Sequence, residues 1–235
     1  MIYFCRPNSS LLRLGKTEFD GKALLKACTN GSSEFVSNIS MSMVSMLYNV
    51  QLLRYAGEDG VAAYGVIMYV NIIFMAIFLG YSIGSAPIVS YHYGAENHTE
   101  LKSMFRKSLI LLTVSGVILV VLSELVARPL VMIFTSYDPE LLDMTASGFQ
   151  LYALAFLPMG FNVWGSAFFT ALNNGAVSAC ISFLRTLVFQ IIVVLTLPIL
   201  LGIDGIWLSI VAAELLSLAV TVSFLLVKRK RYQYA

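Results

Sequence analysis

The sequence predicts an all-α integral membrane protein, a bundle of six helices that each cross the bilayer. Three observations lead to this prediction. Only 12% of the 235 residues are charged and 58% are hydrophobic, where a soluble domain carries about 25% charged residues. Mean hydropathy is +0.81, and long charge-free runs alternate with short charged segments. This number of charges is too small to cover a water-facing surface. We therefore expect the chain to lie in the lipid bilayer.

The charge-free runs mark the spans, because a charge at the bilayer centre costs about 2.5–3.5 kcal/mol. Residues 144–184 carry no charge over 41 positions, twice the roughly 20 residues that cross the hydrocarbon core. Asn173-Asn174-Gly175 is a turn signal that divides this run in two. Spanning strands are not expected, because the runs are apolar on all sides. The expected helices are 27–54, 61–89, 108–134, 143–171, 176–201 and 204–227.

The charges between these helices predict the orientation. Twelve of the fifteen basic residues fall on one side of the expected bundle: Arg6, Arg13, Lys16, Lys22, Lys26, Lys102, Arg106, Lys107, Lys228, Arg229, Lys230 and Arg231. The other side carries only Arg54 and Arg128 beside six acidic residues. Basic loops stay inside the cell, so both termini are expected in the cytoplasm of a multi-pass protein of the cell membrane, here the bacterial inner membrane. A net charge of +2 gives no indication of nucleic-acid binding.

The ends of the chain differ from its middle. Ile2 to Cys5 resembles the end of a preceding helix, and the polar residues up to position 21 are typical of a cytoplasmic linker. Residues 22–228 then form the six-helix lobe, and residues 229–235 a basic cytoplasmic tail. No catalytic, cofactor-binding or phosphate-binding motif occurs in a believable context, which argues against an enzyme. His92 and His98 lack a third ligand nearby, so no metal site is expected.

An ionisable side chain inside a span indicates a functional site. Glu34 is the favoured candidate for coupling or cation binding, because it falls inside the cytoplasmic half of the first helix. Asn38 lies one turn later and offers an oxygen ligand or a hydrogen bond. The alternative for Glu34 is a structural carboxylate bonded to a neighbouring helix.

Glu214 is the second candidate, near the middle of the last helix. Structural pairing with a helix neighbour and a role in coupling are equally open for it. Structural roles are expected for the remaining embedded charges. Glu124 and Arg128 are expected to form an i,i+4 ion pair, and Arg185 is expected to anchor its helix by reaching the cytoplasmic interface. Several uncharged polar and aromatic residues are candidates to line a cavity, among them Gln150, Tyr152, Asn162 and Trp164.

Two longer motifs point to a family. GYSIGSAPIVSYHYGAEN (Gly80 to Asn97) and GFNVWGSAFFTALNNG (Gly160 to Gly175) resemble sequences of the multidrug and toxic compound extrusion (MATE) transporters. NGSSEF near the start and DGIWLSIVAAE near the end fit the same family. The resemblance runs from Lys22 to Arg231 in order and without large gaps, and it matches the C-terminal lobe.

The resemblance implies twelve helices in two six-helix lobes, with a substrate cavity between them. It implies export of drugs by alternating access, driven by an H+ or Na+ gradient, with no other cofactor. Glu34 falls where several members carry an acidic residue that serves cation coupling or substrate binding. Asn162 stands where some branches carry a coupling Asp. We therefore expect a fragment or one partner of a split transporter, whose partner is the missing N-terminal lobe and whose substrates are cationic amphipathic drugs.

Two other functions remain as alternatives. A lipid-linked oligosaccharide flippase of the same superfamily would need several embedded basic residues to meet pyrophosphate, and only Arg185 is embedded. A non-transporting membrane scaffold would need no buried carboxylates, and this chain has them.

Overall fold

The computed structural model describes residues 20–135 and 138–235, except for the side chains of residues 23 and 25–37. The predicted helix end and linker over residues 1–21 therefore lie almost wholly outside the described residues. The chain divides into two units, Met1–Phe35 and Val36–Ala235. In the first unit the described backbone is helical from Gly21 onward. The second unit contains the remaining helices and the candidate site.

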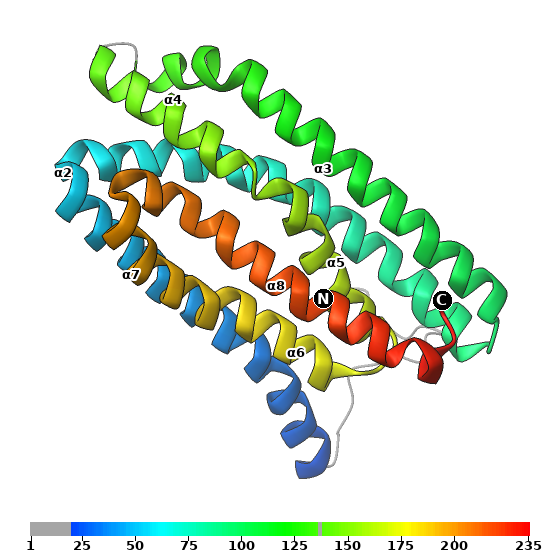
Figure 1. The fold of residues 1–235 in the computed structure, drawn as a ribbon. Coiled ribbons are helices and arrows are strands. Elements are labelled where there is room, and N and C mark those ends of the chain that lie inside the picture. Colours follow the sequence, from blue (N-terminus) through cyan, green and yellow to red (C-terminus); the bar gives the residue numbers. More distant parts are fainter. Residues whose placement is uncertain (1–19, 136–137) are drawn as a thin grey trace, which may run out of the picture. The chain divides into compact units, whose positions relative to one another are not determined.

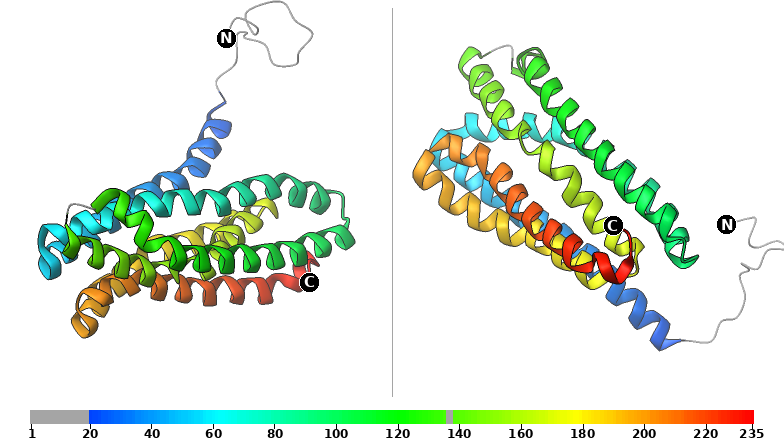
Figure 2. Two further views of the ribbon diagram at one scale, coloured as in Figure 1. Left: turned by 90° about the horizontal axis from the view of Figure 1, so that it is seen from above. Right: turned by 45° about the vertical axis from the view of Figure 1, so that its right-hand side comes forward.

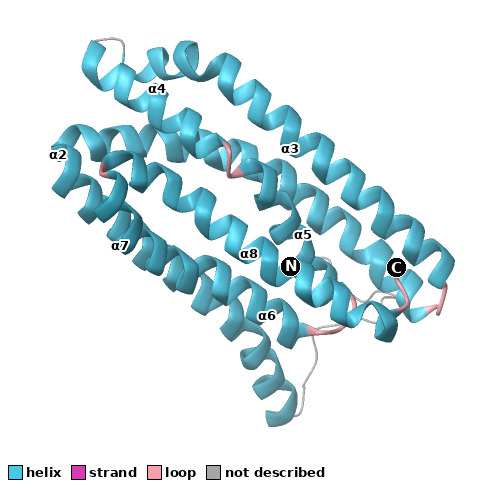
Figure 3. Cartoon of the chain, viewed as in Figure 1, coloured by secondary structure: helices cyan, strands magenta, loops and turns pink. Residues whose placement is uncertain are grey.

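The described residues are helical with short turns and contain no strand, as Figure 3 shows. This confirms the predicted all-α class. The elements are α2 (Gly21–Gly94), α3 (His98–Thr135), α4 (Pro139–Ala153), α5 (Phe156–Ala171), α6 (Gly175–Phe183), the π-helix η1 (Leu184–Val188), α7 (Phe189–Leu201) and α8 (Ile203–Tyr232).

Helix α2 supplies two crossings. Its apolar part, Asn38–Gly94, is 57 residues long, roughly 86 Å of helix against a hydrocarbon core of about 30 Å. The helix reverses at Gly57, whose φ of 67° and ψ of −153° are open essentially to glycine alone. The rings of Tyr48 and Tyr64 stack at 5.4 Å, although sixteen residues of straight helix would separate them by roughly 24 Å. The two arms of α2 are therefore antiparallel neighbours.

The fourth predicted helix is broken in two. Helices α4 and α5 meet at a bend of 49°. Pro158 lies in the first turn of α5 and has no N–H to donate to the carbonyl four residues earlier, Leu154, which explains the break. Asp138 caps the start of α4 by accepting from the backbone N–H groups of Glu140 and Leu141.

Six crossings result for the described residues. Four helices are long and apolar enough to span a bilayer, and the bent pair α4–α5 makes a fifth. Dividing α2 at Gly57 adds the sixth. The fifth predicted helix, 176–201, is built from α6, η1 and α7 in continuous succession.

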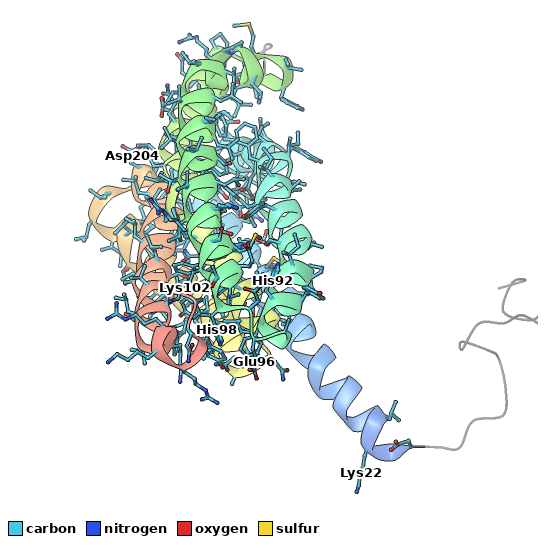
Figure 4. All side chains as sticks on the ribbon, turned by 90° about the vertical axis from the view of Figure 1, so that its right-hand side faces the viewer. Lys22, His92, Glu96, His98, Lys102 and Asp204 are labelled. Carbon is cyan, nitrogen blue, oxygen red and sulfur yellow. The ribbon has the colours of Figure 1, made fainter. Side chains whose placement is uncertain are left out.

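The turns of the second unit gather at two ends (Figures 1 and 2). One end carries the α2–α3 turn and the C-terminus, and the other carries the Gly57 reversal and the α7–α8 turn. Figure 4 shows the charges that go with them, with Lys102 and His98 toward one end and Asp204 toward the other. We call the first the basic end, because the exposed Lys102, Arg106 and Lys107 follow its turn. The separation agrees with the charge split in the sequence, and the cytoplasmic placement of the basic end stays a prediction.

The buried side chains of the helices form narrow stripes that face the interior of the bundle. Helix α3 buries every third or fourth residue, among them Leu101, Leu112 and Leu119, and packs against α4 and α5. Its other faces expose large apolar side chains such as Leu125 and Ile133. Apolar outer surfaces of this extent are expected of helices that contact lipid. Helix α8 lies between α5 and α7 and contacts both (Figure 1).

Candidate functional site

A buried polar cluster joins α5, η1 and α8 in the second unit. Its members are Asn162, Arg185, Glu214 and Thr221, which we call the Glu214 cluster. Asn162 and Thr221 are fully buried, and Glu214 is 1% exposed. The cluster holds both of the charged residues that the sequence places deepest in the last two spans.

The Glu214 cluster lies deep within the helices. Asn162 is nine residues before the end of α5, roughly 13 Å along the helix axis. Arg185 is ten residues after the start of α6, roughly 15 Å from it. Both helix ends belong to the α5–α6 turn, so the two residues reach a similar depth. That depth is about half of a 30 Å hydrocarbon core.

Glu214 is held from two sides. The Nε of Arg185 donates to both carboxylate oxygens, at 2.8 and 3.0 Å. The Nδ2 of Asn162 donates to Oε2 at 2.7 Å. A carboxylate removed from water is tolerated only when it is paired and hydrogen-bonded, and these three bonds meet that condition.

Asn162 connects the carboxylate to the rest of α8. Besides Oε2, its Nδ2 donates to the backbone oxygen of Glu214 at 2.9 Å. Its Oδ1 accepts from the hydroxyl of Thr221 at 3.0 Å. Both donors and the acceptor of this fully buried amide are therefore used, and α5 is fixed to α8 over nearly two turns.

Arg185 reaches the cluster from a π-helix. Its five-residue segment, Leu184–Val188, interrupts the span between α6 and α7. A π-turn inserts one extra residue and rotates the side chains that follow, and such turns are frequent at functional sites. The side chain of Arg185 is 14% exposed. Its terminal guanidinium nitrogens make no hydrogen bond to another described residue, so the pair uses only part of the donor capacity of the arginine.

Close approach of α5 and α8 depends on Gly165. A Cβ at this position would lie 2.5 Å from Cγ2 of Thr221. Only glycine leaves room for Thr221 to reach Asn162, because a contact that short is far inside van der Waals distance.

A second polar contact joins α2 to α7 beside the cluster. The hydroxyl of Tyr48 donates to Oε1 of Gln190 at 2.9 Å, and both side chains are buried. Gln51 donates to the backbone oxygen of Val194 at 3.0 Å. Gln190 lies five residues after Arg185, so the first arm of α2 is hydrogen-bonded to the same span that carries the cation of the pair.

The structure places the predicted site residues as follows. Asn162 is in the cluster, Tyr152 and Trp164 are buried at 4% and 1% exposure, and Gln150 is exposed. Asn38 lies on α2 and is exposed. Their assignment to a cavity or coupling site stays a prediction. The side chain of Glu34 lies outside the described residues, so its role stays a prediction as well.

Two predictions about embedded charges are wrong. Arg185 does not anchor its helix at the interface, because its guanidinium is bonded to Glu214 in the interior. Arg128 does not pair with Glu124 on its own helix. Its Nη2 lies 3.0 Å from Oδ1 of Asp143 at the start of α4, and both side chains are largely exposed. In each case a partner from the next helix is available at the right depth.

The pairing of Arg185 with Glu214 is the feature that the sequence analysis missed. The two residues are opposite charges embedded in consecutive antiparallel spans, and that coincidence was a usable signal. Within the part of the chain that the structure describes, no group of three or more His, Cys, Asp or Glu residues gathers to hold a metal ion.

Comparison with known proteins gives a consistent result. The MatE family model matches residues 35–196, more than half of the chain. An outward-facing multidrug resistance MATE family transporter of the MOP superfamily has a TM-score of 0.83 at 19% identity, covering 97% of this chain and 51% of that one. No curated protein sequence matches the chain significantly.

Two further structures show the same fold. A MOP superfamily transporter from Pyrococcus furiosus, described as having a binding pocket of reverse polarity, gives a TM-score of 0.80 at 21% identity, covering 92% of this chain and 48% of that one. The Vibrio cholerae MATE transporter VcmN in its bent form gives 0.78 at 17% identity, covering 92% and 49%. The chain spans about half the length of the solved transporters that it resembles. The chain belongs to the MATE family of transporters.

Proposed function

We propose that this chain is one lobe of a secondary active transporter that exports cationic amphipathic drugs or xenobiotics in exchange for H+ or Na+. Its partner is a second six-helix lobe, and the substrate cavity lies between the two. The observation that carries the proposal is the Glu214 cluster, a carboxylate in the interior of a membrane-spanning bundle whose countercharge is a single arginine.

The pair links ion occupancy to helix contacts. A cation that binds Glu214, whether H+, Na+ or a substrate, competes with the Nε of Arg185 for the same two oxygens. Binding therefore favours an arrangement in which η1 and α8 are no longer joined by the ion pair. A ligand that binds one of two arrangements more tightly shifts the equilibrium between them, which is what coupling of ion movement to alternating access requires.

Glu34 and Asn38 complete the proposal on the first arm of α2, as a second site of cation or substrate coupling. Gln150, Tyr152, Asn162 and Trp164 are proposed to line the substrate cavity. The oligosaccharide flippase is not favoured, because the positive charge of Arg185 is already neutralised by Glu214 and offers little to a pyrophosphate group.

The test compares Glu214→Gln and Glu34→Gln with wild type in proteoliposomes that hold this lobe together with its partner lobe. Export of the cationic dye ethidium is measured under an imposed pH or Na+ gradient. Each substitution should abolish gradient-driven export without lowering the amount of protein in the membrane. Glu124→Gln is the matched control, because Glu124 is an exposed glutamate on α3, and it should leave export unchanged.

Full gradient-driven export by Glu214→Gln would show that Glu214 is not part of the coupling site. Export by this chain alone would overturn the need for a second lobe.

A further inference from the structure

Four hydroxyl side chains form a continuous hydrogen-bonded chain along the contact between α5 and α6. Thr170 and Ser166 belong to α5, and Ser178 and Ser182 to α6. The Oγ1 of Thr170 lies 2.7 Å from Oγ of Ser178. The Oγ of Ser166 lies 2.8 Å from Oγ of Ser178 and 2.8 Å from Oγ of Ser182. We call these four residues the hydroxyl chain.

The outer end of the hydroxyl chain reaches the surface. Thr170 is exposed and is the next-to-last residue of α5. It lies beside the α5–α6 turn, which belongs to the basic end: Ser90, on α2 four residues before its final Gly94, donates to the backbone oxygen of Ala171 at 2.9 Å.

The inner end of the hydroxyl chain stops one helical turn from the Glu214 cluster. Ser166 is four residues after Asn162 on α5, and Ser182 is three residues before Arg185 on the α6–η1 segment. Side chains at these spacings are neighbours on a helix surface, with about 5–6 Å between their Cβ atoms. One bridging water covers such a distance. Polar side chains on α5 and on the α6–η1 segment thus both lead from the surface toward the ion pair.

A further buried hydroxyl, Ser217, stands on α8 between two members of the Glu214 cluster. Ser217 is 1% exposed, and its Oγ has no hydrogen-bond partner among the residues that the structure describes. It stands on the buried stripe of α8 between Glu214 and Thr221, and both of those residues bond to Asn162. A buried polar atom without a partner is costly, and it is a natural anchor for an internal water.

We propose that the hydroxyl chain conducts protons between the basic end and the carboxylate of Glu214. This inference rests on the proposed function, and it makes H+ the coupling ion. Each hydroxyl accepts a proton from one neighbour and gives its own to the next, since a hydroxyl is both donor and acceptor. A water at Ser217 closes the last turn. The net step moves one proton between water at the basic end and the carboxylate, with no electron transferred, and Arg185 lacks a charged partner while the carboxylate is protonated.

The geometry favours a proton over a metal cation. The hydroxyl oxygens are bonded to one another, so a proton passes along existing hydrogen bonds. A hard cation would need several oxygens around it at once, and each step would break the bonds that the chain is made of. Hydroxyls between membrane helices also serve as structural contacts, so the experiment must separate conduction from packing.

The experiment uses proteoliposomes that hold this lobe with its partner lobe. A pH-sensitive dye trapped inside reports proton movement, and ethidium reports export. The double variant S166A/S182A removes the centre of the hydroxyl chain and keeps the side chains small. Export driven by a pH gradient should slow by about a hundredfold, the lower end of what positioned proton transfer contributes. Ethidium affinity and thermal stability should change little.

Two controls accompany the double variant. As single variants, Ser182→Ala should slow export, whereas Ser182→Thr keeps a hydroxyl at the same position and should retain the wild-type rate. Ser123→Ala removes a buried hydroxyl on α3 that bonds only to the backbone oxygen of Leu119, and it should leave export unchanged.

The outcomes are distinct. Slow export by S166A/S182A with normal ethidium affinity, together with slow export by Ser182→Ala and a wild-type rate in Ser182→Thr, supports the hydroxyl chain. Wild-type rates in S166A/S182A, while Glu214→Gln is inactive, overturn the hydroxyl chain and leave the proposed function intact. A loss of export that matches a loss of folded protein assigns these residues to packing and overturns the inference. Absence of gradient-driven export by wild type overturns the proposed function and this inference with it.

Discussion

Removing one member of the buried ion pair should destabilise the protein far more than removing both. Glu214 is 1% exposed, and in Arg185→Met it loses the two bonds at 2.8 and 3.0 Å. Breaking a buried pair costs about 3–5 kcal/mol, because an uncompensated charge is left in the interior. Glu214 keeps its 2.7 Å bond from Nδ2 of Asn162, so the lower figure, about 3 kcal/mol, is expected. For a chain of this size that corresponds to a fall in Tm of about 6–12 °C.

The double variant R185M/E214M should recover most of this loss. Apolar residues of similar volume in place of a buried pair are often neutral or stabilising, by up to about 4 kcal/mol. Asn162 keeps two of its three bonds in the double variant, because it also bonds to the backbone oxygen of residue 214 at 2.9 Å and to Thr221 at 3.0 Å. No buried amide is left without a partner. Gradient-driven export should nevertheless be absent, since the carboxylate is gone.

Thermal unfolding in detergent measures both effects. The buried Trp164 and Trp207 provide an intrinsic fluorescence signal. The physical argument is refuted if Arg185→Met melts within about 2 °C of wild type, or if R185M/E214M melts no higher than Arg185→Met.

Three further predictions concern single positions. Gly57→Ala forces a Cβ onto a backbone with φ of 67° and should cost about 1–3 kcal/mol, measured as a lower Tm, whereas Gly65→Ala, with open space around it, should be neutral or slightly stabilising. Gly165→Ala places a Cβ 2.5 Å from Thr221 and should cost about 1–3 kcal/mol, while an unchanged Tm would show that α5 and α8 separate freely. Burial of Tyr234 raises its pKa above the ordinary value of 10.0, and the nearby Tyr232 adds a smaller effect in the same direction. The folded state therefore holds this proton where the unfolded state has lost it, and stability should fall as pH rises above about 10; Tyr234→Phe should flatten that slope in Tm measured against pH.

The number and type of the spans followed from the sequence because lipid imposes a simple rule. A crossing needs about 20 apolar residues and internal backbone hydrogen bonds, so charge-free runs locate helices without knowledge of their neighbours. Asn173-Asn174-Gly175 was found as a turn for the same local reason, and the structure ends α5 at Ala171 and begins α6 at Gly175. The separation of basic and acidic ends was also readable from charge positions along the chain.

Helix breaks were only partly predictable. Pro158 lacks a backbone donor, and the bend between α4 and α5 lies just before it. The π-helix that carries Arg185 has no comparable signal, because no residue in Leu184–Val188 demands it. An inserted residue of this kind is stabilised by the side-chain contacts it permits, and those contacts belong to other helices.

The sequence alone determined that this protein is a helical membrane protein with an ionisable residue, Glu214, in its last span, because solvation by lipid acts on each segment separately. It left Glu214 open between structural pairing and coupling, and it assigned Arg185 to the interface. Only the tertiary structure decided that these two residues, 29 positions apart, are one ion pair completed by Asn162. Which faces of α5, η1 and α8 meet depends on the room left by Gly165 and on the rotation introduced by the π-turn, and both are properties of helices packed together.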